Sequence, residues 1–304
     1  MSRFLKCCKR SIRDLGKFAD KHEDVPPEEV VRSCWTSNTS RVSVGFLLYR
    51  WVQFFLHAVF EIISVLDVGR RYNPQFLSSL RVKKTARYYM KWLLYLTHWG
   101  LILNSVQAFM GVWLVQKAHD AQNRTSSEAD NTTQVGPNRT LTKIYCYLWS
   151  VAFHLSSYIT LGFWLLVFDS EVCGIDAVTL SEHGFGLILL LLDLFVSGVP
   201  YKMFSGVFTV LLSTFYLMVT YVHHLFHALD RFQDKPYIYE KGDWSNPVAV
   251  IIYYIFSIFV QISFHFSLWG LYLLRRRLTL AIRTPLVESS QNSTTEQRRP
   301  QLPT

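Results

Sequence analysis

The stretch SEHGFGLILLLLDLFVSGVP, residues 181–200, decides the fold, because it is an apolar run long enough to cross a membrane. It carries Asp193 near its middle. A carboxylate surrounded by lipid at that depth costs several kcal/mol, so Asp193 is expected to face the interior of a helix bundle. We expect its partner there to be Asn104, Gln107 or another buried polar group.

The rest of the chain repeats this pattern. Half of its 304 residues are hydrophobic and 17% are charged. A soluble all-helical enzyme would need amphipathic stripes, whereas residues 248–263 are apolar on every face. We therefore predict an all-α, six-span transmembrane helix bundle, each span being close to the roughly 20 residues that a bilayer needs. The expected spans are 43–66, 88–115, 143–168, 183–200, 205–227 and 247–273. A start of the fourth span near Ala177 would bring His183 into the membrane.

Three parts follow from these spans. Residues 1–41 form a basic N-terminal arm, residues 42–278 the transmembrane domain, and residues 279–304 a polar tail that we expect to be disordered. The net charge of +9 fits attraction to an anionic cytoplasmic leaflet, and no nucleic-acid motif is present. The lipid bilayer is therefore the expected partner.

The five cysteines form neither a zinc pattern nor a disulfide framework, so no metal and no other cofactor is expected. Cys7 and Cys8 lie among basic residues and are either palmitoylation sites or ordinary free thiols. His223 and His227 are four residues apart and could share a metal, but we interpret them as histidines at the membrane interface.

Two features of the loops disagree about orientation. Twenty lysines and arginines fall on the side of the termini and nine on the other, which predicts cytosolic termini. Three glycosylation sequons, at Asn123, Asn131 and Asn138, would instead place the loop 117–142 outside the cytosol. We predict cytosolic termini, in either the plasma membrane or an endomembrane.

The second span carries Thr97, Asn104 and Gln107 at steps of seven and three, so that all three share one helix face. Such residues commonly bond one membrane helix to another. Thr97 and His183 enter their spans from the same side, to depths of about 14 Å and about 9 Å. They could therefore meet in one cavity, where an imidazole would activate the hydroxyl. Asp193 lies about 15 Å deeper than His183, too far to orient it.

Three stretches resemble the rolling stone family: YLTHWGL (95–101), EHGFGLILLLLDLFVSGVP (182–200) and PYIYEKGDWSNP (236–247). Cys34-Trp35 followed by LYRWV (48–52) also fits, and the resemblance covers about residues 35–277. It implies a role in cell–cell contact or myoblast-type fusion.

The family is also distantly similar to androgen-induced membrane proteins, which hydrolyse fatty acid esters of hydroxy fatty acids with an intramembrane Thr and His. Thr97 and His183 match those positions, which implies a lipid or acyl-ester ligand. His98 stands where the family tends to carry Asn after the Thr, and Gly186 where an Asn commonly follows the His by three. A contact or fusion protein and an intramembrane hydrolase therefore both remain as hypotheses.

Overall fold

The protein is seen in a computed structural model that describes Lys17 and residues 23–36, 41–71, 84–127, 137–169, 174–232 and 235–297. Cys7, Cys8 and the sequon Asn131 lie outside these residues. Throughout the part of the chain that is described, the regular structure is helical, which confirms the all-α prediction.

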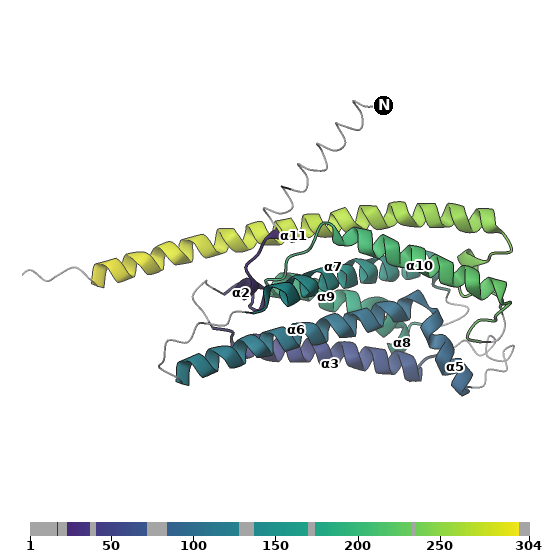
Figure 1. Cartoon of the computed structure of the whole chain (residues 1–304), viewed down its shortest axis with the longest axis horizontal. Helices are drawn as coiled ribbons and strands as arrows, with labels where there is room; N and C mark the ends of the chain where they lie inside the picture. Colours follow the sequence, from purple (N-terminus) through teal and green to yellow (C-terminus); the bar gives the residue numbers. More distant parts are fainter. Residues whose placement is uncertain are drawn as a thin grey trace, which may run out of the picture.

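Long helices lie side by side and run back and forth along one axis (Figure 1). Between them lie the short helices α2 (Pro27–Val30), α5 (Ala86–Met90), η1 (Lys91–Leu94) and η4 (Glu240–Gly242). The long ones and their extensions are α3 (Val44–Leu66), α6 (Leu96–Ser127), α7 (Arg139–Gly162) with η2 (Phe163–Val167), α8 (Ala177–Leu180) with η3 (Ser181–Phe185) and α9 (Gly186–Val196), α10 (Ser205–Leu225), and α11 (Pro247–Gln297).

Five of these segments are long and apolar enough to cross a membrane: Val44–Leu66, Arg139–Val167, Ala177–Val196, Ser205–Leu225 and Pro247–Arg283. The fourth predicted span thus begins at Ala177, the earlier of the two starts considered. The predicted second span forms most of α6, which lies along α3 (Figure 1) but is not among the five. Its buried polar residues make it less apolar, so composition alone does not establish a count of six.

The outer surfaces of the helices are apolar. Large hydrophobic side chains stand exposed on α10 and α11, among them Phe208, Phe215, Ile255 and Phe259. Inside, Tyr145, Trp149, Phe153, Leu190 and Leu194 of α7 and α9 are fully or almost fully buried. Helices that are apolar on the outside and packed within define an integral multi-pass membrane protein.

Capping side chains fix where several helices begin. Ser43 accepts a hydrogen bond from the Phe46 backbone N–H at 3.2 Å to start α3. Asn138 accepts from the backbone N–H groups of Thr140 and Leu141 to start α7. One of the predicted sequons therefore has a structural role as a helix cap.

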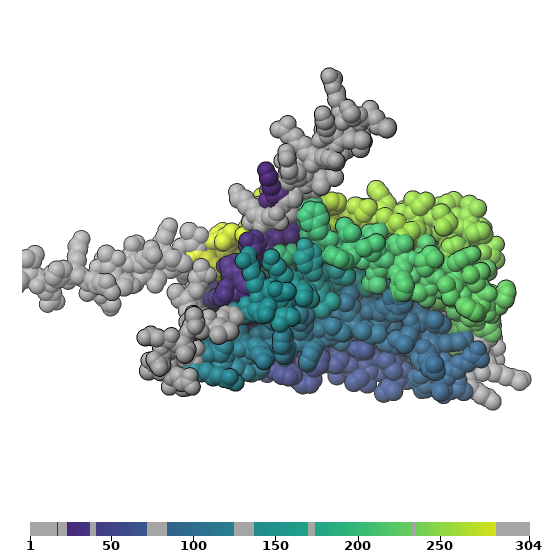
Figure 2. All heavy atoms as spheres, in the orientation of Figure 1, coloured from purple at the N-terminus to yellow at the C-terminus, as the bar shows by residue number. Residues whose placement is uncertain are grey.

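Part of the N-terminal arm packs against the bundle. Glu23 Oε1 accepts from the Met203 backbone N–H at 2.8 Å and from Trp269 Nε1 at 3.2 Å. A Cβ atom at Gly198 would collide with the Glu29 carbonyl oxygen. Residues 23–36 are thus bound closely to the turn after α9, and Figure 2 shows this purple segment packed against the bundle.

The C-terminal boundary differs from the expected one, because α11 continues to Gln297, past residue 278. Residues 271–283, LYLLRRRLTLAIR, contain no glycine or proline, and leucine, arginine and alanine all favour a helix. The part of the chain expected to be a disordered tail therefore begins inside a helix.

Candidate functional site

The second half of the predicted pair, His183, lies in a π-helical turn. Asp176 starts α8 by accepting from the Thr179 backbone N–H at 2.8 Å, and the helix then widens over η3. His183 has φ −128° and ψ 16°, outside the helical region. Glu182 and His183 are both buried in this turn. Turns of this kind are frequent at functional sites.

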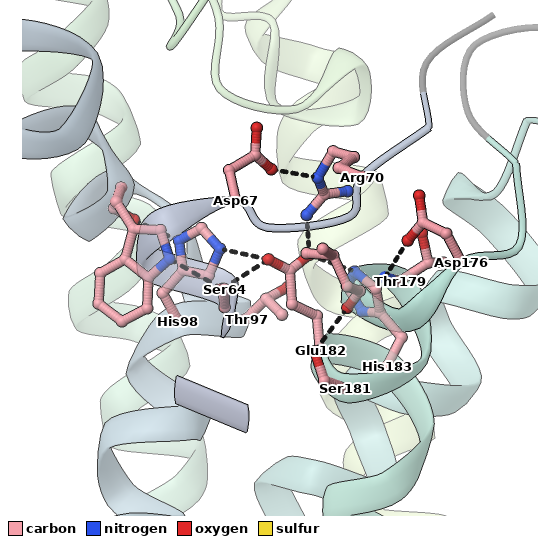
Figure 3. Close-up of polar contacts among 12 residues, drawn as sticks. Ser64, Asp67, Arg70, Thr97, His98, Asp176, Thr179, Ser181, Glu182 and His183 are labelled. Carbon is pink, nitrogen blue, oxygen red and sulfur yellow. Dashed lines mark hydrogen bonds and ion pairs between the residues drawn. The ribbon is translucent and has the colours of Figure 1, made fainter. Parts of the chain in front are cut away.

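Glu182 is the centre of a polar cluster (Figure 3). Ser64 Oγ donates to Glu182 Oε1 at 2.5 Å, and Arg70 Nη2 lies 2.6 Å from Oε2. His98 Nε2 is 3.4 Å from Oε1, and His183 Nε2 is 3.7 Å from Oε2. The carboxylate therefore connects two histidines and an arginine that come from three different parts of the chain.

A second carboxylate, Asp67, extends the cluster. Arg70 Nε lies 2.6 Å from Asp67 Oδ1, so that one guanidinium bridges both acids. Tyr88 donates to Asp67 Oδ2 at 2.8 Å, and Lys84 Nζ is 3.1 Å from the same oxygen. Burial alone would raise the pKa of Asp67, but Arg70 and these hydrogen bonds hold it below its usual value.

His98 is fixed by the turn that precedes α6. Its Nδ1 donates to the Trp92 carbonyl oxygen, and its ring stacks on the Trp92 indole with centroids 4.2 Å apart. Trp92 Nε1 in turn donates to Ser64 Oγ at 2.9 Å. The histidine that departs from the family pattern therefore belongs to the Glu182 cluster.

A cavity of about 220 Å³ adjoins this cluster. Its walls come from the start of α6, the end of α7 with η2, the π-helical turn, α10, the loop before α11, and α11 itself. Thr97 and His183 both line it, as the predicted pair requires. Most of the remaining wall is apolar or aromatic, including Ile159, Phe163, Leu166, Leu217 and Val250. A space of this kind suits an acyl chain with one polar group.

The two side chains are held separately within that cavity. Thr97 Oγ1 hydrogen-bonds the Tyr239 hydroxyl at 3.4 Å. The His183 ring stacks on Phe163, with centroids 3.5 Å apart and planes 3° from parallel, and Trp164 Nε1 donates to the His183 carbonyl oxygen. Within the described residues His183 Nδ1 has no hydrogen-bond partner, and Thr97 and His183 do not bond each other.

A much smaller cavity, of about 10 Å³, lies on another side of Thr97. Asn104, Ser156 and Glu182 are among its polar walls. Asn104 Nδ2 donates to Ser156 Oγ at 2.9 Å, and Ser156 Oγ donates back to Asn104 Oδ1 at 3.1 Å. Asn104, which belongs to the polar face predicted on the second span, thus links α6 to α7.

The expected partner of Asp193 was Asn104, Gln107 or another buried polar group, and the structure shows the last of these. Arg50 Nη1 lies 2.9 Å from both of its carboxylate oxygens. Trp149 Nε1 donates to Oδ2 at 2.7 Å and Tyr49 to Oδ1 at 3.1 Å. Neither Asn104 nor Gln107 is a partner; Gln107 is buried, and its amide atoms have no partner within the described residues.

Four residues of this cluster were not predicted from the sequence: Glu182, Ser64, Asp67 and Arg70. Glu182 lies one position before the predicted fourth span, 183–200, where a carboxylate gives no functional signal. The other three lie at or after the end of the first span, where polar residues are ordinary. Among the described residues no group of three histidine, cysteine, aspartate or glutamate side chains is arranged to hold a metal ion.

The apolar outer surface, the membrane-length helices and the buried polar clusters define the class: a multi-pass helical membrane protein with a cavity inside the bundle. Comparison with known families makes the assignment specific. The family model described as "Protein rolling stone" matches residues 4–289, and the chain belongs to the rolling stone family.

A relative in Drosophila melanogaster, the protein rolling stone, is 24% identical over 255 residues, which are 82% of this chain and 84% of the relative. The recognition made from the three quoted stretches is thereby confirmed. No solved structure matches this chain.

Proposed function

We propose that this protein binds a lipid ester in the cavity beside Thr97 and hydrolyses it, with Thr97 as nucleophile and His183 as general base. One observation carries the proposal: the two side chains, 86 positions apart in the sequence, line the same largely apolar cavity. A fatty acid ester of a hydroxy fatty acid matches the chemical character of this cavity, because it has an acyl chain and a single reactive ester near its middle.

The reaction has two halves. Thr97 Oγ attacks the ester carbonyl carbon while His183 takes its proton; the bond to the alcohol oxygen then breaks, and His183 returns the proton to that oxygen. Water next attacks the acyl group on Thr97, again losing a proton to His183, and the acid leaves as Thr97 regains its proton. The sum is ester and water to acid and alcohol.

The surroundings of His183 suit this role. Its Nδ1 lacks a partner within the described residues, while its Nε2 faces the Glu182 carboxylate at 3.7 Å. A carboxylate on one ring nitrogen stabilises the imidazolium that forms when the other takes a proton. The distance between base and nucleophile commonly shortens only when substrate is bound.

Fluorophosphonate labelling of membranes tests the proposal. We expect wild type to be labelled on the Thr97 peptide, and labelling to be lost in Thr97→Ala and His183→Ala. Thr97→Ser, which keeps a hydroxyl, should retain it. Thr209→Ala and His154→Ala are matched controls, because both residues are fully buried in spans yet do not line the cavity. Folded wild type without labelling at Thr97 would contradict the proposal.

Membership of the rolling stone family supports a second candidate, a role in cell–cell contact or fusion at the plasma membrane. The double variant Thr97→Ala/His183→Ala separates the two candidates. If this double variant restores fusion of cells that lack the protein, the function is cell–cell contact or fusion and not hydrolysis.

The basic residues support cytosolic termini, which are part of both candidates. Protease protection of tags placed at the termini tests this orientation.

A further inference from the structure

We propose that Tyr239 is a third catalytic residue, whose hydroxyl donates a hydrogen bond to the oxyanion formed when Thr97 attacks the ester. The inference rests on the proposed hydrolysis and adds the group that would stabilise its transition state. Donors aimed at developing negative charge commonly contribute more to rate than any other single group.

The position of Tyr239 carries the inference. It comes from the loop between α10 and α11, outside the helices that hold Thr97 and His183. Its hydroxyl lies 3.4 Å from Thr97 Oγ1, and the residue lines the same cavity as both. In the tetrahedral intermediate the oxyanion is bonded to the carbon that Thr97 Oγ has attacked. A donor within reach of that Oγ is therefore close to the place where the charge appears.

Neighbouring rings hold the Tyr239 side chain in place. The Tyr95 ring meets it edge-on, with centroids 5.6 Å apart and planes at 89°, and the Tyr216 ring lies 6.3 Å away. The Gly242 backbone N–H donates to the Tyr239 carbonyl oxygen at 2.8 Å, which closes the short helix η4 after it. A donor fixed before the reaction needs little reorganisation during it.

The hydroxyl also keeps its proton. Burial raises the pKa of Tyr239 to about 12, with a smaller opposing effect from its hydrogen bond to Thr97. At neutral pH the phenol is therefore a donor and a poor base, which leaves proton abstraction to His183.

Four other tyrosines line the cavity: Tyr158, Tyr216, Tyr253 and Tyr254. Tyr216 donates to the Leu94 carbonyl oxygen at 2.9 Å. Tyr158 shares a hydrogen bond of 2.5 Å with Ser257, and Tyr254 shares one of 2.5 Å with Thr214. Within the described residues Tyr239 is the tyrosine of this wall whose hydroxyl hydrogen-bonds Thr97. Tyr201 provides a matched control, because it is fully buried and hydrogen-bonds His265 Nδ1 at 2.9 Å but does not line the cavity.

The test compares Tyr239→Phe with Tyr201→Phe in the full-length protein in nanodiscs. Turnover of a medium-chain p-nitrophenyl ester gives kcat and KM, and binding of a trifluoromethyl ketone, which forms an oxyanion on the nucleophile, gives a second measure. We expect Tyr239→Phe to lower kcat about 100-fold with KM unchanged, and to weaken ketone binding by a similar factor. Tyr201→Phe should stay within about twofold of wild type on both measures.

Thr97→Ala separates the two possible failures. Turnover that is absent in wild type, or that survives in Thr97→Ala, overturns the hydrolase and the role of Tyr239 together. Turnover that depends on Thr97 but has the same kcat in Tyr239→Phe as in Tyr201→Phe overturns the role of Tyr239 alone. So does a change confined to KM, since it would make Tyr239 part of the wall and not of the chemistry.

Discussion

Asp193 and Glu182 lie on the same membrane-spanning segment, and both are buried, yet they differ in what surrounds them. Asp193 follows a regular helical turn and is bonded on both oxygens by Arg50, Tyr49 and Trp149 in a closed core. Glu182 is in a π-helical turn beside a cavity and faces two histidines. A carboxylate buried at membrane depth is therefore expected to be paired, but only its surroundings indicate a functional role.

Removing the cation that pairs with Asp193 should have the largest effect on stability. Arg50→Leu leaves a buried carboxylate without its cation, which costs about 3–5 kcal/mol, enough to lower the yield of folded protein sharply. The double variant Arg50→Leu/Asp193→Leu should recover most of that loss, because it removes both charges. Thermal unfolding in detergent measures both, and a double variant as unstable as the single one would mean that the pair is not a simple structural bridge.

Removing the charge of Glu182 should reduce activity more than stability. Glu182→Gln keeps a side chain of the same shape but removes the charge beside His183, and we expect the rate of fluorophosphonate labelling to fall about 10-fold or more. Its thermal midpoint should fall less than that of Asp193→Asn, because the Arg70 side chain that pairs with Glu182 is 12% exposed, whereas that of Arg50 is 2% exposed. Equal losses of stability in the two variants would remove the distinction drawn between the carboxylates.

Between the two carboxylates, a pair of glycines gives a smaller and more local test. A Cβ at Gly186 would lie 3.0 Å from Asn104 Nδ2, whereas one at Gly184 would meet no atom within 4 Å. Because Asn104 is held by two hydrogen bonds with Ser156, we expect Gly186→Ala to destabilise the protein by about 1 kcal/mol. Gly184→Ala should be close to neutral, and differential scanning fluorimetry compares the two.

The smallest effect concerns pH. The pKa of Asp67 is lower in the folded protein than its value of about 3.9 in an unfolded chain, so its contribution to stability is present above that pH and is lost as pH falls through the folded value. Asp67→Asn should flatten the dependence of the thermal midpoint on pH below about 4, by a few degrees at most. An unchanged slope would mean that Arg70 and Lys84 do not stabilise the ionised form.

The sequence predicts the helical class and the positions of five of the spans, because long apolar runs have few alternatives in a membrane. It also predicts that Thr97 and His183 share a cavity wall, since both enter from one side. Arg50 as the partner of Asp193 could not be predicted, because pairing between helices depends on how each is rotated about its axis. Glu182 was missed because the predicted fourth span begins one position after it, and its pairing with Ser64 and Arg70 depends on helix packing that hydrophobic periodicity does not record.

The packing of the arm has a consequence for how the chain folds. Glu23 is bonded by Met203 and by Trp269, 246 positions away in the sequence. The bond to Trp269 can form only after α11 has been made and packed. Closing so long a loop is slow compared with forming a helix. Chains that end before α11 keep the Met203 contact but lack Trp269, so added protease should cut their arm faster than that of the full chain. Protection of the arm therefore reports completed assembly.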